Sequence, residues 1–137
     1  MTLKTIEWKN NSVIMINQTK LPNSLEYVTY TDYNQVADAI RTLVVRGAPA
    51  IGISGAFGLA LAVLQSDAKE KDQLIQDLKT AKKILFGTRP TAVNLAWGLE
   101  KIMSVAKAGE TVDQIRTSVI ERSEEHTSEL QSRTNLV

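Results

Sequence analysis

The sequence predicts an α+β fold, in which a small antiparallel β-sheet at the amino end is followed by a bundle of about four to five helices. Three observations support this fold class. Short runs of β-forming residues separated by turn residues occupy the first thirty positions, and apolar residues then recur with a helical period. Glycine and proline divide this helical part into separate segments.

The composition is that of an ordinary soluble domain. The chain has 137 residues, of which 43% are hydrophobic and 23% charged, so one core can form. Its net charge of +1, without a long basic run, argues against nucleic acid or a membrane surface as a partner. Cysteine is absent, which excludes disulfides and thiolate chemistry within this chain, and the single histidine, His126, argues against a metal site.

Three strands are expected at the amino end. Residues 5–9 and 12–17 are separated by Asn10-Asn11, a pair suited to a tight hairpin turn. Residues 21–23 interrupt the extended pattern, and residues 26–30 are again rich in β-forming residues. We expect this sheet to pack against the helices rather than to carry chemistry.

Two aromatic residues of these strands allow two interpretations. Trp8 and Tyr27 either pack in the core or across neighbouring strands, or they mark the rim of a ligand site. Packing is the commoner role of aromatic residues in short strands.

The helical period begins with residues 33–45, where the apolar residues share one face. Thr31 or Asp32 is placed to cap the first turn of this helix, and Gly47 is expected to end it. A second helix, residues 49–64, runs through the apolar middle of the chain.

Three further helices follow. Residues 72–85 carry another apolar stripe that Gly87 is expected to stop. The next helix is expected to start at Pro90 and to end at Gly109, and the last begins near Thr111.

Residues 48–64 carry no charge, which raises the question of a membrane span. The stretch is at the short limit for a span and is interrupted by proline and by glycines three residues apart. Because the flanking helices are amphipathic, we expect a buried helix of a soluble domain. The amino end lacks the apolar stretch of a secretory signal, so we expect a cytoplasmic protein.

The most informative string is RGAPAIG, residues 46–52. Glycine lets the backbone approach a ligand closely, and the free amides and dipole of a proline-started helix favour an anion. Arg46 adds a forked, permanently charged donor. The string therefore predicts a phosphate site, although a helix start preceded by a solvated arginine fits the spacing equally well.

A second arginine repeats this arrangement. Arg46 lies three residues before Pro49, and Arg89 lies immediately before Pro90. If the two helix starts converge, both guanidinium groups and both dipole ends point at one anion. Otherwise the repetition is a coincidence, since arginine before a helix is common.

Two strings resemble the signatures of the methylthioribose-1-phosphate isomerase family. VRGAPAIG, residues 45–52, is similar to the first, and TRPTAVNLAWGL, residues 88–99, is similar to the second. The resemblance covers residues 5–121. Related ribose-phosphate isomerases and initiation-factor-2B-like regulatory subunits share the fold and part of the first string.

The resemblance implies a substrate-binding role for Arg46, Gly47, Ala48 and Arg89, with Asn94 as a further candidate. It implies a sugar-phosphate aldose-ketose isomerase of methionine salvage, which converts S-methyl-5-thioribose 1-phosphate into methylthioribulose 1-phosphate. The family's acid/base pair is a cysteine and an aspartate of a carboxyl-terminal Rossmann-like domain, so this chain is expected to hold no catalytic residue and to be inactive alone. A homodimer without metal or organic cofactor is also implied.

Alternative roles remain for Asn94, for three carboxylates and for the protein as a whole. Asn94 either orients the substrate or is a buried amide satisfied by nearby backbone. The carboxylates of Asp32, Asp38 and Glu100 fit caps or solvated charges better than general bases. The alternative functions are a non-enzymatic initiation-factor-2B-like regulatory or nucleotide-sensing subunit and a related ribose-phosphate isomerase. The RPTAVNL string favours the enzyme over the regulatory subunit.

The carboxyl end departs from the pattern. Residues 122–132, RSEEHTSELQS, offer no periodic apolar face to a core, and they read like the translation of a widely used sequencing-library adaptor. We therefore expect residues 1–121 to form the amino-terminal substrate-binding domain and residues 122–137 to be a non-native tail. A genuine short helical or disordered tail is the alternative.

Genomic DNA read across codon 122 tests this boundary. If the tail is an artefact, the native frame continues there into a different sequence. An unbroken genomic frame encoding residues 122–137 would refute the idea.

Overall fold

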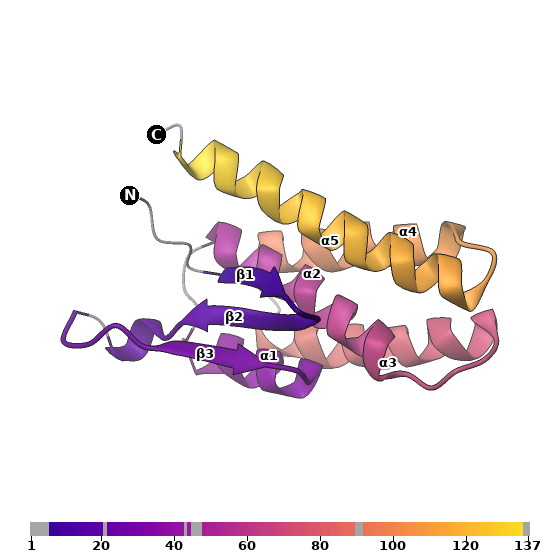
Figure 1. Ribbon diagram of the computed structural model, residues 1–137, viewed down its shortest axis with the longest axis horizontal. Helices are drawn as coiled ribbons and strands as arrows, with labels where there is room; N and C mark the ends of the chain where they lie inside the picture. The colour runs from indigo at the N-terminus through magenta and orange to yellow at the C-terminus, as the bar shows by residue number, and fades with distance from the viewer. Residues whose placement is uncertain (1–5, 21, 43, 45–47, 90–91, 136–137) are drawn as a thin grey trace.

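The computed structural model describes residues 6–20, 22–42, 44, 48–89 and 92–135 (Figure 1). It confirms the α+β fold, because a three-stranded antiparallel sheet is followed by five helices. The strands are β1 (Ile6–Lys9), β2 (Ser12–Ile16) and β3 (Tyr27–Tyr30), and a 3-10 turn spans Gln18–Lys20. The helices are α1 (Tyr33–Arg41), α2 (Ala48–Gln65), α3 (Lys71–Thr88), α4 (Val93–Ala108) and α5 (Val112–Asn135).

The hairpin between β1 and β2 turns at the predicted residues. Asn10 and Asn11 both have positive φ, 54° and 59°, which matches the twist of the flanking strands. The sheet has the order β1-β2-β3, with β2 antiparallel to both neighbours. Trp8 packs against Phe57 of α2 with ring centroids 5.5 Å apart, so the core interpretation holds for this residue, whereas Tyr27 is half exposed.

Helix α1 begins as predicted and ends earlier than predicted. Asp32 caps it through a capping box, in which its side chain accepts from the Asn34 amide at 2.8 Å and Gln35 reaches back to the cap amide. The helix ends at Arg41 because Thr42 leaves helical geometry. The Val44 carbonyl then accepts a hydrogen bond from the Gln18 amide at 2.8 Å, which draws the chain toward the 3-10 turn.

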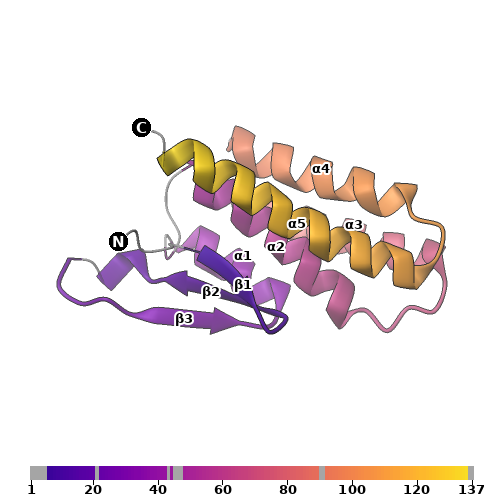
Figure 2. The ribbon, with the colours of Figure 1, turned by 45° about the horizontal axis from the view of Figure 1, so that its top comes forward.

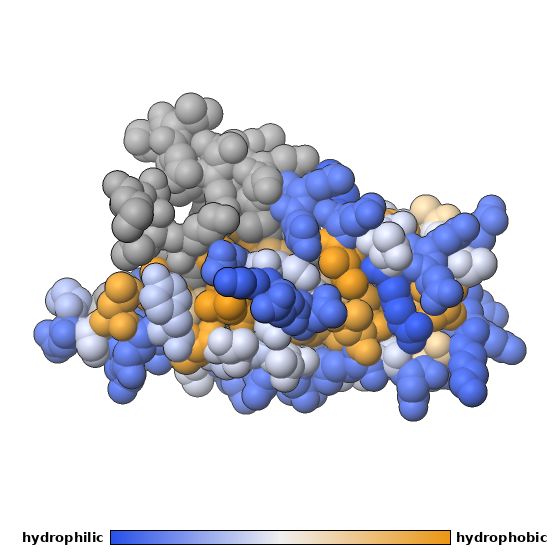
Figure 3. All heavy atoms as spheres, in the orientation of Figure 1, coloured by the Kyte–Doolittle hydropathy of each residue, from blue (hydrophilic) through white to orange (hydrophobic). Residues whose placement is uncertain are grey.

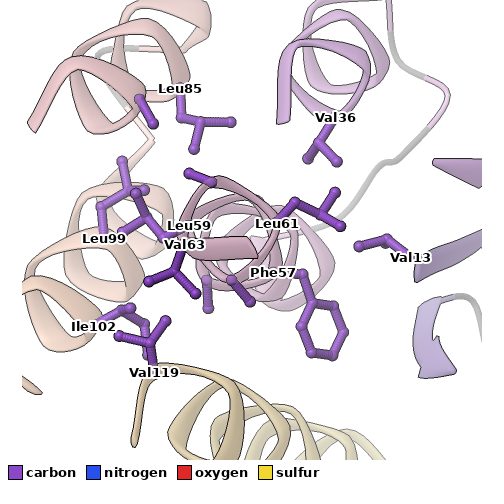
Figure 4. Close-up of a cluster of buried hydrophobic side chains, with 14 of the residues drawn as sticks. Val13, Val36, Phe57, Leu59, Leu61, Val63, Leu85, Leu99, Ile102 and Val119 are labelled. Atoms are coloured by element: carbon purple, nitrogen blue, oxygen red, sulfur yellow. The ribbon is translucent and has the colours of Figure 1, made fainter. Parts of the chain in front are cut away.

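Helix α2 is the centre of the molecule, in contact with all four other helices and with β1. Every residue from 50 to 63 is buried, which confirms the predicted buried helix. In the close-up of Figure 4, side chains of α2 point toward different neighbours, and the labelled residues of this core are Val13, Val36, Phe57, Leu59, Leu61, Val63, Leu85, Leu99, Ile102 and Val119.

The surface seen in Figure 3 belongs mostly to hydrophilic residues, with apolar residues showing between them near the middle of the molecule. This distribution agrees with a central apolar helix under a covering of amphipathic ones. Within the described ranges, no helix is both long and apolar enough to cross a membrane.

Two further predicted helix boundaries were wrong. Helix α3 continues through Gly87 to Thr88, because Gly87 keeps a helical conformation. Helix α4 begins at Val93 rather than at Pro90, with Ala92 as its N-cap. Ahead of α4, the Ala92 amide donates to the Arg89 carbonyl at 3.0 Å. The predicted end of α4 at Gly109 is confirmed.

Helix α5 continues past residue 121, where we expect the native domain to end. It runs to Asn135, and Ser123 is fully buried. Its hydroxyl lies 2.7 Å from the Val119 carbonyl of its own helix and 3.2 Å from the Ala56 carbonyl of α2, and these two acceptors share its one proton. The expectation that no core can use the residues after 121 was therefore wrong for Ser123, because a small hydroxyl fits against the backbone of α2. The non-native origin of residues 122–137 stays a prediction.

Arg116 of α5 ties the carboxyl end of α2 in place. Its Nε donates to the Val63 carbonyl at 3.1 Å, and its Nη2 donates to the carbonyls of Ser66 at 2.7 Å and Ala68 at 3.4 Å. A cation at this position satisfies one carbonyl of the last turn of α2 and two carbonyls of the segment that follows, and it complements the helix dipole. Helix α2 has no basic residue in its own last turn, so α5 supplies this charge.

We predict that Arg116→Met lowers the free energy of unfolding by about 1.5–3 kcal/mol, because hydrogen bonds from a charged group are lost. Urea denaturation followed by circular dichroism measures the loss. The control is Arg41→Met, whose exposed ion pair with Asp38 should contribute less than about 1 kcal/mol. Equal losses in the two variants would contradict the capping role.

Candidate functional site

The amino-terminal turns of α2 and α4 touch backbone to backbone. A Cβ built on Gly52 of α2 would lie 2.8 Å from the carbonyl oxygen of Asn94, and one built on Gly98 would lie 2.7 Å from the carbonyl oxygen of Gly52. Both separations are shorter than real Cβ contacts, so a side chain at either position would push the helices apart. A shared anion site requires the two helix starts to converge, and this contact brings them together.

The two helices run in the same direction. Gly52 lies against Asn94 and Gly98, and Gly55, further along α2, lies against Leu95 and Leu99, further along α4. Figure 2 shows α4 alongside α2. Their amino ends therefore lie at the same end of the bundle, and the positive ends of both dipoles share one location.

The charges around the helix starts distinguish this pair from the other helices. Helix α1 has Asp32 as its cap, α3 has Asp72 in its first turn and α5 has Asp113. Helices α2 and α4 have no acidic residue in the first turn, and the N-cap of α4, Ala92, makes no side-chain capping bond. The two helix starts that meet are thus the two without a carboxylate, which leaves their positive ends for an external anion.

Arg89 is the C-cap of α3, three residues before the N-cap of α4. Its side chain is partly buried, its amide donates to the Phe86 carbonyl at 3.3 Å, and its carbonyl accepts from the Ala92 amide at 3.0 Å. These bonds hold its backbone at the exit of α3 and close to the start of α4. The residue was expected directly before the helix, and it lies one short turn earlier because α4 begins at Val93.

The structure describes two of the four remaining predicted site residues. Arg46 and Gly47 lie outside the described residues, and Ala48 is the first residue of α2. Asn94 is the second residue of α4, partly buried, with its carbonyl against Gly52. The structure brings Ala48's helix start and Asn94 to one end of the bundle, and the meeting of the two guanidinium groups stays a prediction.

The three carboxylates set aside in the sequence have structural partners. Asp32 caps α1, and Asp38 pairs with Arg41 at 2.6 Å. Glu100 pairs with Lys82, and the hydrogen bond from that ammonium group lowers the pKa of Glu100. None of the three is at the meeting point of α2 and α4. In the described part of the chain, no group of three or more His, Cys, Asp or Glu side chains could hold a metal ion.

The glycines that create this contact were missed as site residues in the sequence. Gly52 ends the RGAPAIG string and Gly98 lies inside the TRPTAVNLAWGL string, so each signature supplies one half of the crossing. The signal in the sequence was a glycine three residues after Pro49 and another eight residues after Pro90.

Comparison with known proteins shows the class of the molecule. The sequence model of the Initiation factor 2 subunit family matches residues 44–137, most of the chain and both helices of the candidate site. The chain belongs to this family.

The curated relatives specify the branch that it resembles. A methylthioribose-1-phosphate isomerase of Geobacter sp. (strain M21) is 49% identical over 113 residues, which are 82% of this chain and 33% of the relative. The solved structure of 5-methylthioribose 1-phosphate isomerase from Pyrococcus horikoshii OT3 matches with a TM-score of 0.89 and 38% identity, over 93% of this chain and 36% of that one. The translation initiation factor eIF-2B subunit delta from A. fulgidus matches with a TM-score of 0.88 and 39% identity, over 93% and 37%. This chain thus spans about a third of the length of the relatives it matches.

We predict that Gly98→Ala lowers the free energy of unfolding by about 1–3 kcal/mol, because overpacking forces backbone shifts. The matched control is Gly87→Ala in α3, where an added Cβ would meet nothing within 4 Å. Alanine there should leave stability unchanged or raise it, since it favours the helix. Thermal and urea unfolding of both variants test the contact, and a Gly98→Ala variant as stable as wild type would show that α2 and α4 are not packed this closely.

Proposed function

We propose that this chain is the amino-terminal part of an S-methyl-5-thioribose-1-phosphate isomerase, which converts methylthioribose 1-phosphate into methylthioribulose 1-phosphate in methionine salvage. The observation that carries the proposal is the meeting of two acid-free helix starts beside Arg89. The curated relatives that bear this enzyme's name support the choice of substrate.

The proposed role of this chain is to anchor the phosphate. First-turn amides of α2 and α4 point toward the shared end of the bundle, and the two dipoles favour a dianion there. Arg89, with Arg46, adds charged hydrogen bonds to the phosphate oxygens. Gly47 and Ala48 let the backbone come close to the ligand, and Asn94 is placed to orient the sugar.

The chemistry explains why such an anchor matters. An aldose-ketose isomerisation moves a proton between adjacent carbons and needs an acid and a base near those carbons. The 1-phosphate blocks simple ring opening, so orientation of the substrate carries a large share of the work. We propose that the acid/base pair is a cysteine and an aspartate in the part of the full-length protein that this chain does not span.

The proposal extends to the organisation of the whole protein. Residues 1–121 form the substrate-binding domain, and a Rossmann-like domain completes the cleft. The full-length protein is a cytoplasmic homodimer that uses neither metal nor organic cofactor, and the 137-residue chain alone does not turn over substrate.

The second candidate is a non-enzymatic initiation-factor-2B-like regulatory subunit. The eIF-2B delta structure matches as well as the isomerase structure does, with TM-scores of 0.88 and 0.89, so the fold supports both functions equally. The 41–51% identity of the isomerase relatives favours the enzyme. Turnover of methylthioribose 1-phosphate by the full-length protein separates the two.

We predict that Arg89→Ala in the full-length protein weakens binding of methylthioribose 1-phosphate by roughly ten- to a hundredfold, because a charged hydrogen bond to phosphate contributes about 1.5–3 kcal/mol. Arg89→Lys should retain part of the affinity, since it keeps the charge and loses the fork. Calorimetric titration measures both variants.

The matched control is Arg41→Ala, an exposed arginine of α1 that pairs with Asp38. It should leave the affinity unchanged. If Arg89→Ala binds substrate as tightly as this control, Arg89 is not part of the site, and measurable turnover by the 137-residue chain would overturn the division of labour between the two domains.

A further inference from the structure

We propose that the groove between α3 and α4 is a second anion site, which binds a small polyanion carrying a flat apolar group, of the size and chemistry of a nucleotide. The groove is an open depression with a volume of about 320 Å³, within the range of small-molecule pockets. Its lining consists of Lys79, Lys82, Lys83, Phe86, Met103 and Lys107.

The basic side chains converge because of helix geometry. Lys79, Lys82 and Lys83 are spaced three and four residues apart on α3, which places them on one face, with Phe86 a further turn along. On α4, Lys107 lies one turn after Met103. The two helices therefore present ammonium groups from both sides of one cavity.

The positive charge of the groove exceeds the negative charge beside it. Of the carboxylates around these lysines, Glu100 pairs with Lys82 across the two helices. The hydrogen bond from Lys82 and the charges of Lys82 and Lys107 lower the pKa of Glu100, which shows that this carboxylate lies in a positive field. An additional anion would lie in the same field, beside four lysines and one carboxylate.

The apolar part of the lining favours a ligand that carries an apolar group as well as negative charge. Met103 is only 1% exposed and forms a buried floor, whereas Phe86 keeps 40% of its surface exposed at the cavity wall. A large aromatic ring left open beside ammonium groups is suited to stack on a flat ligand. Inorganic phosphate would use the lysines alone, and a nucleotide would use the lysines and Phe86 together.

This inference is independent of the proposed isomerase function. The groove lining contains none of the residues assigned to the sugar phosphate, which lie at the starts of α2 and α4. Failure of one site leaves the other untouched, and separate variants test each.

The experiment titrates the 137-residue chain with ATP in the absence of divalent metal, by calorimetry. Inorganic triphosphate and adenosine are titrated in parallel. We expect ATP to bind about tenfold more tightly than triphosphate, because a stacked base adds roughly one tenfold step in affinity. Adenosine should not bind measurably.

Two double variants identify the location. Lys79→Gln/Lys83→Gln should weaken ATP binding at least about tenfold, since two charged contacts are lost. Lys20→Gln/Lys69→Gln removes the same charge from exposed positions outside the groove and should change the affinity less than about twofold. Phe86→Leu should reduce ATP binding to the level of triphosphate.

The remaining outcomes overturn the proposal. These are equal losses in the two double variants, unchanged binding in Phe86→Leu, or no binding of ATP at millimolar concentration to a chain that circular dichroism shows to be folded. Loss of ATP binding in Arg89→Ala, with Lys79→Gln/Lys83→Gln unaffected, would place the nucleotide at the sugar-phosphate site and also refute the groove. If the short chain does not fold, the same titrations on the full-length protein decide between these results.

Discussion

The close crossing of α2 and α4 at Gly52 and Gly98 is the contact on which the candidate site depends. It lets two parallel helices begin at one place, which is electrostatically unfavourable because the positive ends of two dipoles lie side by side. At the starts of α1, α3 and α5, a carboxylate offsets the positive end of the helix dipole. No acidic residue does so in the first turn of α2 or α4. An anion bound at the crossing would replace the repulsion between the two positive helix ends by attraction to both. Relief of that repulsion would then add to the free energy of anion binding.

The rest of the fold holds this crossing in position. Helix α2 is apolar on all sides, so the other helices and the sheet surround it. At the opposite end, Arg116 of α5 donates to the Val63 carbonyl in the last turn of α2 and to the Ser66 carbonyl just after it. Ser123 of α5 is buried with its hydroxyl against the Ala56 carbonyl in the middle of α2. Stability of the core and geometry of the site are therefore properties of one helix.

Local patterns predicted most of the fold, because the signals were short-range. Asn10-Asn11 specified the hairpin, Asp32 the start of α1, and Gly109 the end of α4. One miss was a local helix boundary, and the other depended on a contact between distant segments. Gly87 does not end α3, and Ser123 is buried by α2 rather than by any periodicity of its own. In the site, the residue types were visible in the sequence, whereas convergence of the helix starts was not, since it rests on a tertiary contact of two glycines.

The most direct test is a crystal structure of the full-length protein with methylthioribose 1-phosphate bound. The account predicts phosphate oxygens within hydrogen-bonding distance, about 2.7–3.2 Å, of first-turn amides of both α2 and α4, with the Arg89 guanidinium on the same phosphate. A phosphate bound away from these two helix starts, or held by one of them alone, would contradict it.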